Sequence, residues 1–212
     1  VYVGGYFITN ISGAPVRNLG KWNGSSWSQV GDGINGIVYD LLFRQNDLYV
    51  AGIFNSASGV AATNIVRWDG TNWYALGTGI SGSTNGNAGV RTMVLDSNGD
   101  LIVGGNFRDA GGVEVNNIAR WDGSQWHDMG GGLFNGGSGA GVSSLVTLGT
   151  DVYAAGTFKS AGGVIATNVA RWDGTQWHSM NAGPNGSYNA LTVVGTTLYT
   201  AGSFTNISGV AA

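Results

Sequence analysis

Asn117-Ile118-Ala119-Arg120-Trp121-Asp122-Gly123-Ser124-Gln125-Trp126 is the stretch that decides the fold, because the chain contains four copies of it. Close copies begin at Asn64 and Asn168, and a more diverged copy occupies residues 18–27. All eight tryptophans lie in these copies, as the pairs Trp22/Trp27, Trp68/Trp73, Trp121/Trp126 and Trp172/Trp177. The first tryptophans of successive pairs are therefore 46, 53 and 51 residues apart. Self-similarity at such a period predicts a repeat architecture, in which one supersecondary unit is used several times.

One unit, residues 89–130, shows the expected local structure. Its apolar runs at 90–95, 101–107, 117–121 and 125–129 are short, and none has a helical period. Asp122-Gly123 predicts a type I′ hairpin turn between the last two runs, because that turn needs positive φ at both central positions. Short strands at even spacing with turn signals between them predict an all-β fold.

Four antiparallel strands in units of about 40 to 50 residues form the blade of a β-propeller. Because the units follow one another without a linker, we predict a single β-propeller domain over residues 1–212. The repeats are approximately 1–47, 48–100, 101–151 and 152–197, with a partial repeat at 198–212. Both ends of the sequence fall at nearly the same phase of the repeat. We therefore expect a segment of a longer protein, completed by further repeats or by strand exchange with a neighbour.

Paired small residues end one strand of every repeat, as Gly4-Gly5, Ala51-Gly52, Gly104-Gly105, Ala155-Gly156 and Ala201-Gly202. Preceded by an aromatic residue and followed by a tryptophan, this pattern resembles the Kelch-type propeller blade. The fuller pattern, Leu-Tyr-Val-x-Gly-x-Phe and then Asn-Ile-Ala-Arg-Trp-Asp-Gly-x-x-Trp, is similar to tandem repeats of large secreted and cell-surface bacterial proteins. It is also similar to repeats of certain fungal cell-surface polarity markers. The resemblance covers nearly the whole chain and implies a Kelch-like propeller that serves as a binding platform. Ala-Gly in place of Gly-Gly and long glycine-rich insertions depart from the Kelch pattern.

The composition excludes several classes of function. Charged residues are 10% of the chain, against about 25% in typical soluble domains, and the net charge of −3 provides no basic surface for nucleic acid or anionic lipid. The chain has no cysteine, so it forms neither disulfides nor thiolate metal sites. No apolar stretch is long enough to span a bilayer. Low charge with abundant Asn, Ser, Thr and Gly favours an extracellular or cell-surface location.

Because the strands of a predicted blade are antiparallel, successive connections between them emerge alternately on two opposite faces. Minimal turns lie on one face, and longer loops lie on the other, where binding residues are usually found. The loop between the second and third strands is nearly constant across repeats, which favours a structural role, whereas the crossovers between blades differ. We therefore expect any single ligand site among the crossover residues Asn85, Asn87, Phe134, Asn135, Asn185 and Tyr188. The alternative is that these crossovers are spacers of drifting length.

Other candidate sites are better explained as structure. His127 and His178 occupy the same register one repeat apart, which indicates surface residues of the outer strand rather than a metal or catalytic pair. An Arg or Lys precedes the first tryptophan of each pair, at Lys21, Arg67, Arg120 and Arg171. Stacking on tryptophan or pairing with an acid of the same blade is favoured over a ring that binds anions. Residues 96–100 resemble the start of a calcium loop but lack its bidentate Glu, so a plain turn is favoured.

The sequence therefore predicts a non-catalytic structural scaffold and interaction platform, without cofactor or metal. No nucleophile elbow, phosphate loop or carboxylate pair is present, and the tryptophan pairs are interpreted as packing between blades. Expected partners are other surface proteins, glycans or copies of the chain. Alternatives are a lectin with one sugar pocket per blade and a repeating subunit of an extracellular filament or surface layer. An enzyme of the galactose-oxidase kind is disfavoured because no Tyr/His copper set is found. Asn-x-Ser sequons for N-glycosylation begin at Asn10, Asn23, Asn185 and Asn206.

Overall fold

The computed structural model describes residues 1–11, 14–83, 86–136, 139–180, 186–204, 206–207 and 210–211, and this part of the chain consists of antiparallel strands and turns without a helix. Within it, three four-stranded sheets have the same strand order. Sheet II contains β4 (Ile37–Arg44), β5 (Asp47–Ile53), β8 (Ile65–Trp68) and β9 (Trp73–Ala75). Sheet III contains β11 (Gly89–Leu95), β12 (Leu101–Asn106), β15 (Ile118–Trp121) and β16 (Trp126–His127). Sheet IV contains β18 (Gly141–Leu148), β19 (Asp151–Thr157), β22 (Val169–Trp172) and β23 (Trp177–Ser179). The predicted all-β, four-stranded unit is confirmed.

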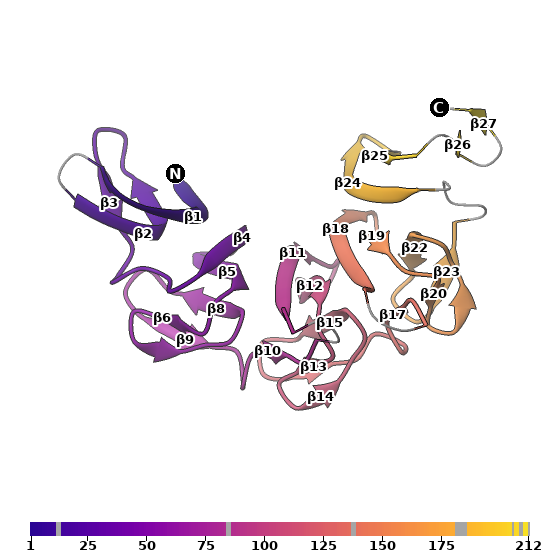
Figure 1. Cartoon of the computed structure of the whole chain (residues 1–212), viewed down its shortest axis with the longest axis horizontal. Coiled ribbons are helices and arrows are strands. Elements are labelled where there is room, and N and C mark those ends of the chain that lie inside the picture. The colour runs from indigo at the N-terminus through magenta and orange to yellow at the C-terminus, as the bar shows by residue number, and fades with distance from the viewer. Residues whose placement is uncertain are drawn as a thin grey trace.

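Two smaller sheets flank these three in the described part of the chain. Sheet I contains β1 (Tyr2–Ile11), β2 (Ala14–Trp22) and β3 (Trp27–Gln29), and sheet V contains β24 (Ser187–Val194) and β25 (Thr197–Ser203). In Figure 1 these sheets follow one another along an arc that is open between sheets I and V. The first strands β4, β11, β18 and β24 lie on the inner side of the arc, and each packs against the next.

The segment between the second and third strands is a short hairpin rather than a loop. These hairpins are β6 (Ser56–Ala57) with β7 (Val60–Ala61), β13 (Asp109–Ala110) with β14 (Val113–Glu114), β20 (Ser160–Ala161) with β21 (Val164–Ile165), and β26 (Asn206–Ile207) with β27 (Val210–Ala211). The crossover from the preceding sheet adds a strand to them, as β10 (Ile80–Ser81) does to β13 and β17 (Leu133–Phe134) does to β20. Ala110 and Ala161 are fully buried at these junctions, which confirms the structural role predicted for the repeated segment.

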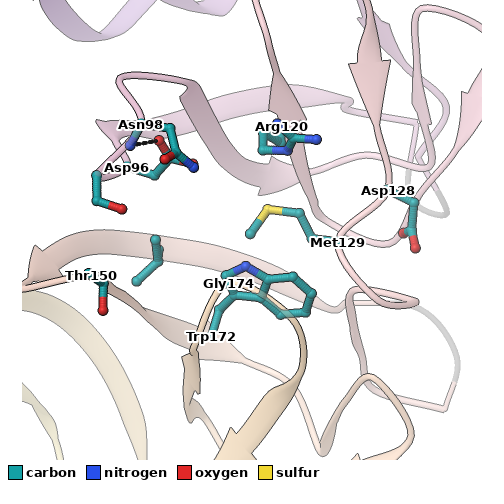
Figure 2. Close-up of a pocket in the computed structure, with 10 residues that line it drawn as sticks. Asp96, Asn98, Arg120, Asp128, Met129, Thr150, Trp172 and Gly174 are labelled. Carbon is teal, nitrogen blue, oxygen red and sulfur yellow. Dashed lines mark hydrogen bonds between the residues drawn. The ribbon is translucent and has the colours of Figure 1, made fainter.

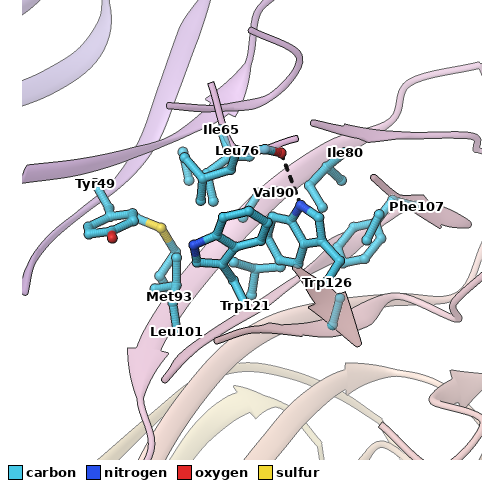
Figure 3. Close-up of a cluster of buried hydrophobic side chains, with 14 of the residues drawn as sticks. Tyr49, Ile65, Leu76, Ile80, Val90, Met93, Leu101, Phe107, Trp121 and Trp126 are labelled. Atoms are coloured by element: carbon cyan, nitrogen blue, oxygen red, sulfur yellow. Dashed lines mark hydrogen bonds between the residues drawn. The ribbon is translucent and has the colours of Figure 1, made fainter. Parts of the chain in front are cut away.

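The hydrophobic core lies between consecutive sheets rather than inside one. Figure 3 shows the core between sheets II and III, where Tyr49 and Ile65 of sheet II meet Leu101 and Trp126 of sheet III. Trp126 Nε1 donates a hydrogen bond at 3.0 Å to Leu76 O, just after the last strand of the preceding sheet. The rings of each tryptophan pair are 4.9 to 5.4 Å apart. As predicted, six tryptophans pack in the cores between sheets, namely Trp68, Trp73, Trp121, Trp126, Trp172 and Trp177. Trp22 and Trp27 of sheet I stack on each other but belong to none of the buried clusters among the described residues.

In sheets II, III and IV, the glycine that ends the small-residue pair is required by close backbone approach. A Cβ atom at Gly105 would lie 2.1 Å from Gly89 O, and one at Gly52 would lie 1.9 Å from Ile37 O. Both distances are far below van der Waals contact, so only glycine fits where the second strand passes the start of the first.

A recurring asparagine links each sheet to the crossover that follows it. The described residues in this position are Asn18, Asn64, Asn117 and Asn168, all in the left-handed region with φ between 61° and 65°. Asn117 Oδ1 accepts a hydrogen bond from Phe107 N at 3.2 Å, and its Nδ2 donates to Leu133 O at 2.7 Å. The side chain thus satisfies two backbone groups of different elements, and asparagine is one of the few residues other than glycine that tolerates this φ.

The predicted type I′ turn at Asp122-Gly123 is wrong. Trp121 pairs with Trp126, so the loop has four residues, and in it only Gly123 has a positive φ. Asp122 Oδ1 instead accepts hydrogen bonds from the backbone N–H groups of Ser124 at 2.7 Å and Gln125 at 2.9 Å. An Asx-type turn of this kind replaces the tight hairpin.

Candidate functional site

A cavity of ≈ 300 Å³ opens between sheets III and IV, on the face that carries the short turns. Figure 2 shows the Trp172 indole and the Met129 side chain in its middle, with Asp96 and Asn98 at one end and Asp128 at the other. These residues come from the turn after β11, from the segment that follows β16, and from the third strand of sheet IV. The cavity therefore brings together an aromatic wall and several polar groups from different elements.

The aromatic wall is held rigidly. Trp172 is half-buried and packs on the buried Trp177, with ring centroids 5.4 Å apart. Trp177 Nε1 donates a hydrogen bond to Met129 O at 2.6 Å, which fixes the pair against sheet III. A Cβ atom at Gly130 would lie 2.9 Å from Trp172 Cζ3, so the Gly130 backbone packs against the edge of the indole. A ligand would meet an indole that is already in place.

The polar groups are partly committed to local structure. Asp96 Oδ1 accepts hydrogen bonds from Asn98 N at 2.8 Å and Asp100 N at 2.9 Å, and these bonds close a turn between β11 and β12. Asp128 Oδ2 accepts a hydrogen bond from Gly131 N at 2.7 Å. In each carboxylate the other oxygen remains as an acceptor, because an ionised carboxylate has several lone pairs. Arg120, which also lines the cavity, forms an ion pair with Asp100.

The repeats differ at the position that controls this cavity. Arg44 is the last residue of the first strand of sheet II, and its partner in the register of the second strand is Asp47. In sheet III the last partners of the first and second strands are Leu95 and Leu101. Asp96 follows Leu95, and its N–H donates a hydrogen bond to Asp100 O, so these two residues take the places of Arg44 and Asp47. Asp96 is therefore the counterpart of Arg44, and a short acid stands where the preceding sheet has a long cation.

Arg44 fills the equivalent space between sheets II and III. Its Nη2 atom lies 3.9 Å from Asp100 Oδ1, and its Nη1 atom would lie 3.7 Å from a Cβ atom at Gly123. At this interface Trp121, the counterpart of Trp172, is only 8% exposed. The exchange of arginine for aspartate thus explains why the indole is accessible between sheets III and IV.

The crossover residues predicted to bind a ligand do not line this cavity. Asn85 and Asn185 lie outside the described residues. Asn87 is exposed ahead of β11, and its carbonyl accepts a hydrogen bond from Asn106 Nδ2 at 3.4 Å. Phe134 lies in β17, where the Arg108 guanidinium is 5.0 Å from its ring, and Asn135 follows it. The expectation that the long-loop face carries the site is not met by this cavity, which opens on the other face.

Tyr188 corrects the prediction further. It lies in the first strand of sheet V and is 3% exposed, so it belongs to the core and not to a crossover loop. Its ring packs 5.9 Å from that of Phe204. Burial raises the pKa of the Tyr188 hydroxyl above its usual range, because the phenolate would lose hydration.

The arginines and histidines of the repeat are paired within their own sheets. Arg67 Nη1 lies 2.6 Å from Asp47 Oδ2, and the same ion pair recurs in sheets III and IV, which confirms the predicted pairing. His127 Nε2 lies 2.6 Å from Asp122 Oδ2 in the adjacent turn. This hydrogen bond, with further ones from backbone N–H groups, holds the pKa of Asp122 well below its usual range. His178 makes the same contact with its own turn, so the two histidines do not form a joint site.

The predicted glycosylation sequons are described only in part. Asn23 is exposed in a turn, where its Oδ1 accepts hydrogen bonds from Ser25 N and Ser26 N, both at 2.9 Å. Asn10 lies in β1 and Asn206 in β26, and the side chains of both fall outside what is described. Asn185 lies outside the described residues altogether.

Within the ranges that the structure describes, no three His, Asp or Glu side chains are grouped closely enough to hold a metal ion. The same ranges contain no helix of the length and apolar character needed to cross a membrane. Neither a protein-family model nor a curated protein sequence matches the chain. The repeat pattern and the chemistry of the cavity are therefore the grounds on which a function can be proposed.

Proposed function

We propose that this chain is part of a Kelch-like β-propeller that acts as a non-catalytic scaffold and binding platform outside the cell or at the cell surface. Three observations support the propeller. The four-stranded sheets share one strand order, successive sheets pack face to face, and their first strands lie on the inner side of one arc. Hydrogen bonds also join neighbouring first strands, since Asp40 Oδ2 accepts from Met93 N at 2.6 Å and Thr92 Oγ1 accepts from Leu145 N at 3.2 Å. Sheets packed radially around an axis place their first strands innermost in this way.

We further propose that the ligand is a neutral saccharide bound in the cavity between sheets III and IV. The observation that carries this proposal is the Trp172 indole, which faces the carboxylates of Asp96 and Asp128 across the cavity. The weakly positive C–H face of a sugar ring suits the negative face of an indole. Its hydroxyl groups can donate hydrogen bonds to the carboxylates and accept one from the Asn98 amide. A volume of ≈ 300 Å³ is at the lower end for ligand pockets and corresponds to about one sugar ring.

The charge of the cavity favours a neutral sugar over an acidic one. Asp96 and Asp128 are negative, whereas the only cation in the lining, Arg120, is balanced by Asp100. A carboxylate-bearing sugar would face like charges, which disfavours it. The alternative of one sugar pocket per blade is less favoured, because Arg44 occupies the corresponding space between sheets II and III.

A glycan array followed by titration of the best ligand tests this proposal. Binding should shift the indole N–H resonance of Trp172 in the NMR spectrum of the whole chain. Asp96→Arg should fill the cavity as Arg44 does and weaken binding at least about tenfold, while the matched Leu148→Arg, at the same position of sheet IV, should not. An array without hits on correctly folded protein, or Asp96→Arg protein that binds normally, would refute the saccharide proposal.

A further inference from the structure

A second cavity, of ≈ 260 Å³, lies between the same two sheets on the opposite face. It is lined by Arg91 and Asn106 of sheet III, by Ser143 and Thr157 of sheet IV, and by the backbone of residues 139–141. Arg91 and Ser143 belong to the first strands of their sheets, and Asn106 and Thr157 end the second strands. This cavity is therefore at the inner side of the arc and is separate from the one that contains Trp172.

β-Bulges place Arg91 and Ser143 in this position. The strand register shifts between Val90 and Thr92 in β11 and at the equivalent point of β18, so one residue in each strand lacks a direct partner. Both bulge residues are exposed. The residues that follow the bulges form the hydrogen bonds between sheets, as Thr92 does with Leu145 N. The bulge side chains themselves are aimed away from the core, a common function of bulges near binding sites.

The repeats again show why space exists at this interface. Ile53 pairs with Ile37 in sheet II just as Asn106 pairs with Gly89 in sheet III. Between sheets II and III, a Cβ atom at Gly89 would lie only 2.5 Å from the Ile53 side chain. Between sheets III and IV, a Cβ atom at Gly141 would meet nothing closer than 3.4 Å, and Asn106 Cβ would be 3.9 Å away. Asparagine thus leaves open the space that isoleucine fills.

The chemistry of the lining is that of an anion site. Among the ion pairs of the described residues, none includes Arg91, in contrast to Arg67, Arg120 and Arg171. The guanidinium instead lies 5.6 Å from the ring of Tyr39, the bulge residue of sheet II. No carboxylate lines the cavity, while Ser143 and Thr157 each contribute a hydroxyl group that can donate a hydrogen bond.

We propose that this second cavity binds the oxyanion of an acidic saccharide, either a carboxylate or a sulfate group. Arginine binds such groups with two parallel hydrogen bonds, and these charge-assisted bonds are stronger than neutral ones. The hydroxyl groups of Ser143 and Thr157 complete the donor set on the side of sheet IV. The proposal does not depend on the saccharide site at Trp172, because the two cavities share no lining residue and differ in charge.

Amide NMR titrations of the whole chain with sodium glucuronate, sodium sulfate and glucose, at constant ionic strength, test the proposal. Glucuronate or sulfate should shift the amide resonances of Gly141 and Ser143, and glucose should not. A stronger response to glucuronate assigns the site to carboxylates, and a stronger response to sulfate assigns it to sulfate esters. No response to either anion, or an equal response to glucose, would overturn the proposal.

Variants identify the residues responsible. Arg91→Gln should weaken anion binding at least about tenfold, since hydrogen bonds to charged groups contribute more than neutral ones. Arg17→Gln, which removes another exposed arginine, should leave binding unchanged. Asn106→Ile should close the cavity, and Asp96→Arg should affect only the saccharide site at Trp172. Anion binding that survives Arg91→Gln unchanged, in protein with an otherwise intact amide spectrum, would contradict the assignment.

Discussion

Replacing Asn117 by alanine is expected to destabilise the protein by about 3–5 kcal/mol. Asn117 is 1% exposed, and its side chain joins Phe107 N to Leu133 O at 3.2 and 2.7 Å. Alanine would leave both of these backbone groups without a partner, at a cost of about 1–3 kcal/mol each. Asn117 has a φ of 65°, in the left-handed region. A residue with a Cβ atom is destabilised there by about 1–2 kcal/mol unless, like asparagine, its side chain forms local hydrogen bonds. Simple addition of these terms would give more than about 5 kcal/mol at the upper end, but we expect a smaller total because the effects of neighbouring groups are not additive.

Two matched variants separate the contributions. Asn117→Gly removes the same hydrogen bonds without the Cβ penalty, so it should be about 1 kcal/mol less damaging than alanine. Asn168→Ala removes the equivalent bonds to Phe158 N and Gly186 O in sheet IV, at 3.1 and 2.7 Å. Asn168 is partly exposed, so water can reach the two groups that lose their partner, but its φ of 63° carries the same Cβ penalty, and the cost should fall to about 2–3 kcal/mol.

Urea unfolding measures these differences, provided that the m-values of the variants agree. Hydrogen exchange at the Phe107 amide gives a local check, since that N–H loses its acceptor in both variants of Asn117. If Asn117→Ala costs less than about 1 kcal/mol, or no more than Asn168→Ala, the buried hydrogen bonds do not stabilise the junction as argued.

Three further predictions concern other recurring contacts. His127→Ala should raise the pKa of Asp122 toward its ordinary value in a carboxyl NMR titration, because the hydrogen bond from His127 is the largest cause of its depression. A carboxyl group whose pKa is lowered by folding stabilises the fold above about pH 4, and this stabilisation is lost as the pH falls further. His127→Ala should therefore lose less stability than the unmodified protein when the pH is lowered from about 5 to about 2. Gly105→Ala should cost about 3 kcal/mol in urea unfolding, because its Cβ would lie 2.1 Å from a backbone carbonyl, whereas Gly99→Ala in an open turn should cost about 1 kcal/mol. Arg44→Asp should open a cavity between sheets II and III like the one at Trp172, so calorimetry with the ligand proposed for that site should find a stoichiometry of two in place of one.

The sequence predicts the repeated sheet well, because every copy carries the same constraints. The tryptophan pairs mark the third and fourth strands, and the obligatory glycine marks the end of the second. The turn at Asp122-Gly123 was predicted wrongly because the dipeptide also suits a longer loop. The Asp122 carboxylate stabilises that loop by accepting two backbone hydrogen bonds, an option that a count of turn residues does not weigh.

Tyr188 shows that the repeat pattern does not predict where each first strand begins. The crossovers differ in length, so the sequence does not say at which residue the next first strand begins. Only the pairing of Tyr188 with Gly202, which matches that of Val142 with Gly156, shows that it is a core residue of the first strand. The two cavities were missed for a related reason. The differences between Arg44 and Asp96 and between Ile53 and Asn106 are visible in the sequence, but their equivalence depends on the strand register.

In a protein built from repeats, the constant positions are committed to packing, so a specific site must arise where a position varies and also faces a neighbouring sheet. The interface between sheets III and IV meets this condition twice, with Asp96 on one face and Asn106 on the other. A generally loose interface would explain both cavities without any binding function, but the core between them argues against it. Ile118, Leu133 and Phe158 are at most 1% exposed there, as closely packed as their counterparts between sheets II and III. Each opening therefore follows from one local difference between repeats, Asp96 in place of Arg44 and Asn106 in place of Ile53, where a shorter polar side chain leaves a gap unfilled. Binding sites added to an intact scaffold are expected to arise in this way.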